Sequence, residues 1–207
     1  MSFSIYHIAC LFALMTSCCV SSKDFFDCSS YLPNATNVQA FVVKKRFDFW
    51  GLFFSRPQNW DVKHNGQPIG RIRVDKTLLQ VSRSAENDGT CHREGTGLER
   101  CTWSQNPTRP KLASVHYDRP SNNGTAVLDG PQPEGQINFE QRSSLNRIVM
   151  ELNDSDNVLN NLHGVIASHP SFLPIYTMCL ATTTPVPVEA SIQDAFQLAS
   201  IVVIYKP

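Results

Sequence analysis

Histidine and cysteine are the residues of this chain best suited to metal or redox chemistry, because imidazole and thiolate groups are strong metal ligands. Five histidines lie beyond position 22: His64, His92, His116, His163 and His169. No two have the i, i+2 or i, i+4 spacing that places two imidazoles on one face of a strand or helix. His92 adjoins Cys91, but the cysteines lack the Cys-x-x-Cys spacing of zinc sites. We expect no metal and no cofactor; the candidates for a new imidazole site are His163, His169, His116 and His64.

Other catalytic signatures are missing from the sequence. It contains neither the G-x-S-x-G motif of serine hydrolases nor a glycine-rich phosphate loop. The carboxylates of Asp154 and Asp156 fall in a polar stretch, where we expect them to be solvated. A group of aromatic residues in and after the segment FWGLFF remains: Trp50, Phe53, Phe54 and Trp60. We expect them to pack in the core, with an exposed recognition patch as the alternative.

The segment at positions 1–22 has the anatomy of a secretory signal peptide. It contains no Asp, Glu, Lys or Arg, and an apolar run over residues 8–14 precedes small residues suited to cleavage before Lys23. The run is shorter than the roughly 20 residues of a membrane span, and no later stretch is longer. We therefore expect a secreted, extracellular protein without a stable membrane span, with an uncleaved anchor as the alternative.

The cysteine count agrees with an oxidising compartment. Four of the seven cysteines lie beyond the leader, and this even set allows three pairings. Cys91 and Cys101 flank a loop in which two glycines permit a tight reversal, so we prefer the pairs Cys91–Cys101 and Cys28–Cys179. Glycosylation sequons begin at three asparagines: Asn34, Asn123 and Asn153.

Composition excludes some classes of protein. The 207 residues include 18 Lys and Arg and 18 Asp and Glu, so the formal net charge is zero. Charged residues make up 17% of the chain, against roughly 25% in typical soluble proteins. Nucleic-acid binding needs clustered Lys and Arg, so we expect no nucleic-acid partner. With 42% hydrophobic residues the chain is too apolar to be disordered as a whole.

The hydrophobic pattern favours short strands. There are 13 Pro and 10 Gly, and no window keeps helical apolar spacing for three clean turns. We expect strands at residues 38–44, 50–54, 70–74, 78–81, 126–128, 135–141, 147–152 and 199–205. Alternation places Ile137 and Phe139 on one face of their strand, and Ile148, Met150 and Leu152 on one face of the next, with a hairpin connection at residues 141–146.

Three other segments complete the expected organisation. Residues 199–204 are apolar except for Ser200, as in a strand buried on both faces, and only residues 191–198 suit a short helical turn. Residues 82–110 are rich in Gly, Glu, Arg and Asn, and we expect a loop there. Residues 182–188 cannot pair as a central strand, because Pro185 and Pro187 lack backbone donors.

Part of the C-terminal half resembles the copper/zinc superoxide dismutases. TAVLDGPQPEGQINFEQ, from residue 125, resembles the opening strands of that family, and the similarity continues through RIVMELNDSDNVLNNLHG to Leu162-His163-Gly164. The terminal SIVVIYKP resembles the strand that bears the family's last copper ligand. The resemblance runs continuously over residues 125–164 and returns at residues 200–207, and residues 23–120 have no counterpart.

At the metal-site positions the chain departs from the family. Ile166 and Ser168 stand where two copper ligands are expected, and His169 lies one residue further, on the opposite face of a strand. No bridging histidine follows Cys179, the zinc loop is missing, and Ile204 occupies the position of the last copper ligand. By resemblance His163 is a structural histidine, which we expect to be buried and bonded to backbone groups.

The resemblance implies an all-β fold, a Greek-key sandwich or barrel of the copper/zinc superoxide dismutase type, incomplete or rearranged. The expected organisation is a signal peptide at residues 1–22, a β-rich region at 23–120 and a dismutase-like domain at 121–207. The chain ends before the family's last strand, which would leave an open sheet edge in a truncated product. We expect residues 38–81 to supply the missing strands.

Two functions follow. The first is a secreted, superoxide dismutase-like protein that is not an enzyme and serves as a binding or structural module, with another protein or a second copy as partner. The alternative is a superoxide dismutase or other metal-binding redox protein that uses displaced histidines or a partner chain. It would hold copper or zinc and needs at least three imidazoles around one ion.

Overall fold

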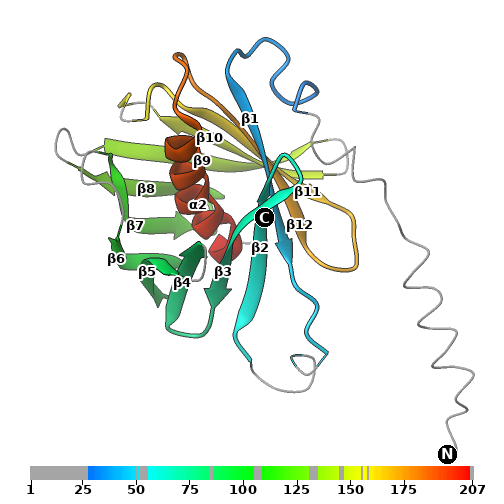
Figure 1. The fold of residues 1–207 in the computed structure, drawn as a ribbon, viewed down its shortest axis with the longest axis vertical. Helices are drawn as coiled ribbons and strands as arrows, with labels where there is room; N and C mark the ends of the chain where they lie inside the picture. The colour runs from blue at the N-terminus through cyan, green and yellow to red at the C-terminus, as the bar shows by residue number, and fades with distance from the viewer. Residues whose placement is uncertain are drawn as a thin grey trace, which may run out of the picture.

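Twelve antiparallel strands close into one barrel in the computed structural model (Figure 1). The structure describes residues 28–49, 51, 56–83, 86–104, 109–130, 135–144, 147–154, 156–157 and 159–205. The first six strands are β1 (Val38–Lys45), β2 (Gln58–His64), β3 (Gln67–Val74), β4 (Leu78–Arg83), β5 (Glu86–Glu94) and β6 (Gly97–Trp103). The second six are β7 (Lys111–Asp118), β8 (Asn123–Asp129), β9 (Gly135–Ser144), β10 (Arg147–Asp154), β11 (His163–His169) and β12 (Ile175–Ala181). One long helix, α2 (Val188–Tyr205), follows them.

Strand order in the barrel follows strand order in the chain. Each strand pairs with its neighbours in sequence, and β1 pairs with β12 from Val38↔Ala181 to Lys44↔Ile175. This confirms the all-β class and the contribution of residues 38–81 to closure, which leaves no open sheet edge among the described strands. The Greek-key arrangement of the dismutase type is not confirmed, because the pairing is that of an up-and-down barrel.

Alternation of apolar and polar residues builds the strands, as the sequence predicts. In β9, Ile137 and Phe139 are buried inside the barrel while Asn138 between them lies on the other face. Met150 and Leu152 of β10 are buried in the same way. The hairpin between β9 and β10 forms as predicted, but β9 continues to Ser144, which pairs with Arg147, so the connection is shorter than the predicted residues 141–146.

The predicted loop at residues 82–110 is wrong, because most of it forms β5 and β6. Gly95, with φ of 54°, and Thr96 make the reversal between these strands, and the Cys91–Cys101 disulfide joins them. Their polar residues face solvent on the outside of the barrel, so a polar sequence is compatible with a strand there. Gly89 is required for packing, since a Cβ at this position would lie 2.4 Å from the Trp103 ring.

The strand predicted at residues 199–205 is also wrong: these residues form the second half of α2. The helical turn predicted at residues 191–198 lies in its first half. Most of α2 is buried on every side, as expected of a helix surrounded by a closed sheet. A run such as Ile201-Val202-Val203 suits a buried strand and a buried helix equally, and the closed barrel leaves room only for the helix.

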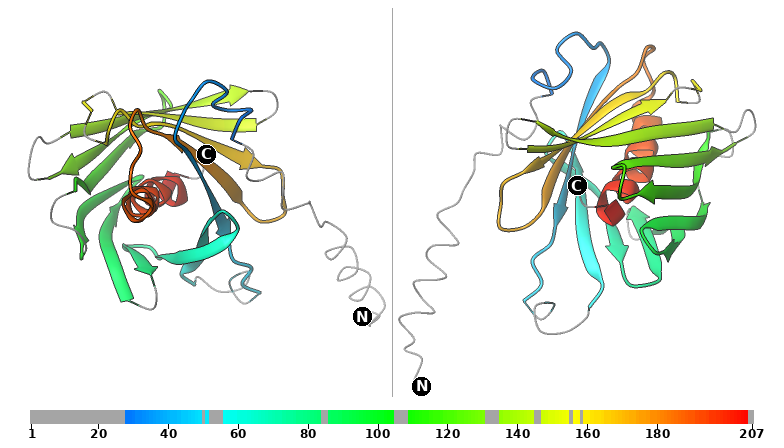
Figure 2. Two further views of the ribbon diagram at one scale, coloured as in Figure 1. Left: turned by 45° about the horizontal axis from the view of Figure 1, so that its top comes forward. Right: turned by 180° about the vertical axis from the view of Figure 1, so that it is seen from behind.

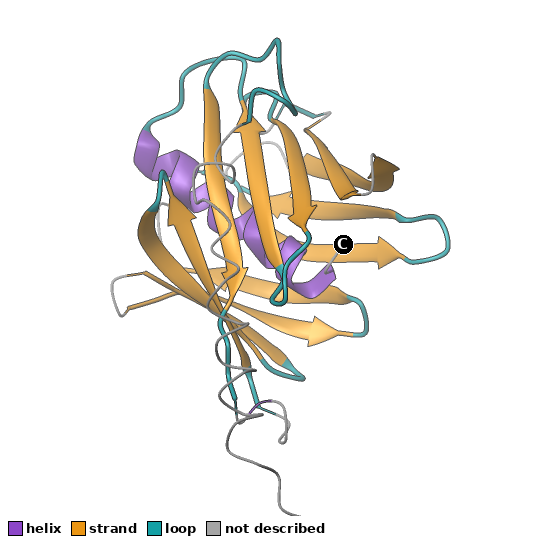
Figure 3. Ribbon diagram, turned by 90° about the vertical axis from the view of Figure 1, so that its right-hand side faces the viewer, coloured by secondary structure: helices purple, strands orange, loops and turns teal. Residues whose placement is uncertain are grey.

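The helix runs through the interior of the barrel, enclosed by the strands (Figures 2 and 3). Phe196 is 1% exposed and packs against Gly70 of β3, where a Cβ would lie 2.5 Å from the Phe196 ring. At the far end of the helix, Tyr205 donates a hydrogen bond to Gln141 and contacts the hydroxyl of Tyr117. The helix therefore replaces the central cavity that an empty barrel would have.

The expected boundary at residues 120–121 falls in the turn between β7 and β8, and strands from both sides of it close the same barrel. The predicted leader at residues 1–22 lies outside the described residues, as does most of the strand predicted at 50–54. In the part of the chain that the structure describes, no helix is long and apolar enough to cross a membrane.

Candidate functional site

A cleft of about 1200 Å³ opens at one end of the barrel. We call this end the cleft end; it carries the described residues of the β1–β2 connection (46–49, 51, 56 and 57), the β3–β4 turn at 75–77 and the β11–β12 connection at 170–174. Helix α2 begins at the opposite end, because it follows the other end of β12. The cleft volume is somewhat larger than the roughly 300–1000 Å³ of typical small-molecule sites.

Positive charge is concentrated in the cleft. Five cationic side chains line it: Lys45, Arg46, Arg56, Lys76 and Arg93. Two carboxylates, Asp48 and Asp75, line it as well. This excess occurs in a chain whose formal net charge is zero. An anion entering the cleft would therefore meet a positive electrostatic potential, which the zero net charge of the chain does not predict.

Several of these cations are available to a ligand. Arg46 is engaged, since its Nε lies 2.8 Å from a carboxylate oxygen of Asp61. Lys45, Arg56 and Lys76 make no ion pair with any carboxylate in the described ranges. Three cations of the cleft are thus open to an external anion.

The acidic residue of the β3–β4 turn is bound to its own backbone. The Asp75 carboxylate accepts hydrogen bonds from the N–H groups of Thr77, at 2.9 Å, and Leu78, at 2.8 Å. These bonds lower the pKa of Asp75, because they stabilise its ionised form. Arg93 is fixed beside this turn, where its Nη1 donates to the Asp75 carbonyl oxygen at 2.7 Å.

Two polar atoms of cleft-lining residues are buried without a hydrogen-bond partner. They are Oε1 of Gln58 and Nε of Arg93. Buried polar atoms in folded proteins nearly always have a partner, so such exceptions require an explanation. One is an acceptor and the other a donor of a charged guanidinium.

Exposed aromatic side chains lie next to these charges. Phe47 is 50% exposed and Phe172 is 73% exposed; both line the cleft, and their ring centroids are 6.4 Å apart. They come from connections far apart in the chain, β1–β2 and β11–β12. The cleft thus combines apolar contact area with cationic side chains.

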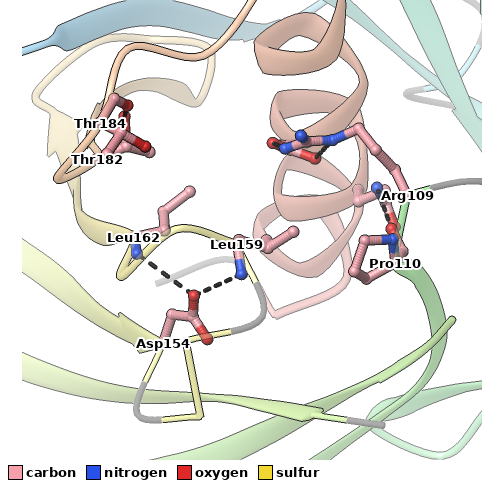
Figure 4. Close-up of polar contacts among 9 residues, drawn as sticks. Arg109, Pro110, Asp154, Leu159, Leu162, Thr182 and Thr184 are labelled. Atoms are coloured by element: carbon pink, nitrogen blue, oxygen red, sulfur yellow. Dashed lines mark hydrogen bonds and ion pairs between the residues drawn. The ribbon is translucent and has the colours of Figure 1, made fainter. Parts of the chain in front are cut away.

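The opposite end of the barrel is occupied by a polar network that holds α2. Asp194 of the helix is 3% exposed and forms a buried ion pair with Arg109, whose Nε lies 3.4 Å from Oδ1 (Figure 4). Burial raises the pKa of Asp194, and the adjacent guanidinium opposes this shift. Gln197, one turn further along α2, accepts a hydrogen bond from the backbone N–H of Leu112. We assign this network a structural role.

Asp154 also lies at the end of the barrel opposite the cleft, and the prediction that it is solvated is wrong. Its side chain is buried rather than solvated, and its carboxylate accepts hydrogen bonds from Leu159 N, at 2.6 Å, and Leu162 N, at 3.4 Å (Figure 4). The carboxylate satisfies backbone donors in the β10–β11 connection, which explains its burial. Asp156 is exposed, as expected.

The four candidate histidines do not meet. His64 stacks on Phe41, with ring centroids 4.7 Å apart, and burial lowers its pKa. His163 and His169 begin and end β11, so they lie at opposite ends of the barrel, and His116 is exposed on β7. Among the described residues no group of three or more His, Cys, Asp or Glu side chains could hold a metal ion. His163 is exposed, contrary to the prediction of a buried structural histidine.

The remaining predicted residues are placed as follows. Both preferred disulfides form, and Cys28–Cys179 ties the N-terminal segment to β12. The sequon residues Asn34, Asn123 and Asn153 are exposed, and none lines the cleft. Trp60 is fully buried and stacks on Tyr176, which confirms the core prediction for this residue; Trp50, Phe53 and Phe54 lie outside the described residues.

The sequence predictions missed the cleft. Its cations come from β1, β5 and two connections, so no local motif contains them. Arg46 and Arg56 flank the aromatic segment FWGLFF, and this pairing of cations with aromatic residues was the local sign of the cleft. A missed sign of β2 was the dipeptide Asn65-Gly66, whose φ angles of 48° and 81° suit the tight turn of a β-hairpin.

No family model, curated protein or solved structure matches this chain.

Proposed function

We propose that the protein is a secreted, non-catalytic binding protein whose cleft takes an anionic ligand. The observation on which this depends is the set of three unpaired cations, Lys45, Arg56 and Lys76, in a cleft of ligand size. Charge-assisted hydrogen bonds from such groups bind phosphate, sulfate or carboxylate. Arg93, whose Nη1 is fixed on the Asp75 carbonyl oxygen, adds a further guanidinium to the lining.

Three features support a non-catalytic role. The cleft contains no histidine or cysteine among its described lining residues, so this lining offers neither an imidazole as general base nor a thiol as nucleophile. Its carboxylate at Asp75 is held ionised by backbone donors and is therefore poorly suited to proton transfer at neutral pH. The dismutase resemblance adds no site, because Ile166 is in the core and Ile204 lies in α2 rather than in a strand.

Secretion is supported by the leader sequence and by the two disulfides, which are consistent with an extracellular protein. Expression in a eukaryotic secretory host should release a protein that begins at Lys23. Intact mass before and after glycosidase treatment measures both the cleavage site and the use of Asn34, Asn123 and Asn153. A protein that stays in the cell fraction with residues 1–22 uncleaved would contradict this part of the proposal.

Binding is tested by calorimetric titration with dodecyl phosphate below its micellar concentration. We expect a single site on the wild type and at least about a tenfold loss of affinity in Lys45→Gln/Lys76→Gln, because each charge-assisted bond contributes roughly 1.5–3 kcal/mol. The matched control is Lys44→Gln, whose exposed side chain is adjacent in β1 but does not line the cleft. Equal affinity in all three proteins, or no binding, would refute an anion site in the cleft.

A further inference from the structure

We propose that the cleft end of the barrel docks onto the surface of an anionic lipid bilayer, with a lipid phosphate in the cleft and phenylalanine side chains in the interface. The proposal rests on the anion-binding cleft and names its occupant. It concerns docking on the surface, not insertion of a helix.

The distribution of exposed apolar residues supports this surface. Among the described residues four large hydrophobic side chains are exposed: Phe47, Phe49, Phe172 and Val188. The three phenylalanines are all in connections at the cleft end, whereas Val188 starts α2 at the opposite end. Exposed aromatic rings grouped at one place mark an interaction surface, while a single exposed valine needs no explanation.

The charges select a lipid surface as the occupant. Phe47 and Phe172 line the same cleft as Lys45, Arg56 and Lys76, which have no ion-pair partner in the part of the chain that is described. Aromatic rings beside Lys and Arg are the composition of segments that lie in the headgroup region of anionic membranes, where the rings enter the acyl boundary and the cations contact phosphates. Hydrophobic contact and charge complementarity therefore act at the same place and in the same direction.

The sequons leave this end accessible. Asn123 and Asn153 line a groove on the outer face of β8 to β11, together with Tyr31 of the N-terminal segment. None of the three sequon asparagines lines the cleft, so glycans at these positions would not stand between the phenylalanine rings and a membrane.

The test is co-sedimentation with vesicles made of seven parts phosphatidylcholine to three parts phosphatidylserine, compared with vesicles of pure phosphatidylcholine. We expect binding to the anionic vesicles, weaker binding to neutral vesicles, and weakening of the anionic binding in about 0.5 M salt. Phe47→Ser/Phe172→Ser should reduce the partition coefficient about a hundredfold, at roughly tenfold for each ring. Lys45→Gln/Arg56→Gln/Lys76→Gln should reduce it by a similar factor, at roughly fivefold for each cation.

Two controls separate this inference from the proposed function. Val188→Ser removes the exposed apolar side chain at the opposite end and should leave vesicle binding unchanged. Phe49→Ser, which alters an exposed ring at the cleft end that does not line the cleft, should weaken vesicle binding and still bind inorganic phosphate as the wild type does, while the triple cation variant should lose both phosphate and vesicles.

The outcomes are distinct. Phosphate binding without vesicle binding would overturn membrane docking and leave the anion site intact. Vesicle binding that is equal on neutral and anionic lipid, or unchanged in the phenylalanine variant, would also overturn docking by this surface. A wild-type protein that does not bind inorganic phosphate would overturn the proposed function and the inference together.

Discussion

Replacing Arg109 with methionine removes the cation that neutralises Asp194 inside the barrel. The Asp194 side chain is 3% exposed, and the Arg109 side chain is 17% exposed. A buried carboxylate that loses its partner typically destabilises the native state by about 3–5 kcal/mol. The variant can avoid part of this penalty only by protonating Asp194 in the folded state.

The pH dependence of that penalty follows from the ordinary pKa of 3.8 for Asp194. At about 1.4 kcal/mol for each pH unit, keeping such a carboxyl protonated costs about 4 kcal/mol at pH 7 and about 2 kcal/mol at pH 5. A folded pKa above the unfolded value gives stability at low pH that is lost as pH rises toward the folded pKa. The free energy of unfolding of Arg109→Met should therefore fall by about 2–3 kcal/mol between pH 5 and pH 7, relative to wild type. These are upper values, because burial already raises the pKa of Asp194 in the wild type.

Urea unfolding between pH 5 and 8, followed by tryptophan fluorescence with the disulfides intact, measures this effect. Arg109→Met/Asp194→Asn carries no buried charge at this site, so its stability relative to wild type should lack the pH 5–7 dependence of the single variant. Arg142→Met, which removes an exposed ion pair with Glu140, should leave the unfolding midpoint unchanged. A penalty in Arg109→Met that is equal at pH 5 and pH 7 would refute the pairing of Asp194 with Arg109 as the interaction that holds α2.

Three further predictions concern the barrel. Gly70→Ala should destabilise the protein by about 1–3 kcal/mol in urea unfolding, because its Cβ would lie 2.5 Å from the Phe196 ring and 2.6 Å from the Ser82 carbonyl oxygen. Adding Phe196→Leu relieves only the first contact, so the double variant should lose less stability than the sum of the two single variants, and additive losses would contradict the packing of α2 on β3. Replacing Cys28 and Cys179 with alanine should cost about 5 kcal/mol on the chain-entropy model for a separation of 151 residues, and an unchanged thermal midpoint would show that this link does not constrain the unfolded chain. Burial raises the pKa of Tyr176 to about 12, so the free energy of unfolding should fall as pH rises above 10. In the absorbance titration at 295 nm, Tyr176→Phe should remove a step near the high-pH end. An unchanged high-pH end of the titration curve would show that this ring is solvated.

Local sequence patterns determined the strands whose two faces differ. Ile137 and Phe139 alternate with polar residues, and this period of two fixes both the strand and its inward face. The cysteine pattern also worked locally, because the glycines between Cys91 and Cys101 permit the reversal that brings the two sulfurs together. In these cases the deciding interactions lie within a short stretch of the chain.

The tertiary structure decided the conformation of residues 199–205 and the composition of the cleft. Ile201, Val202 and Val203 would be buried in either a strand or a helix, and they are helical because twelve strands already close the barrel around them. Lys45 and Phe172 are separated by most of the chain and share a cleft only because β1 closes the barrel against β12. A local pattern records how a residue fits its neighbours in sequence, and neither barrel closure nor the long-range contacts that it creates are present at that scale.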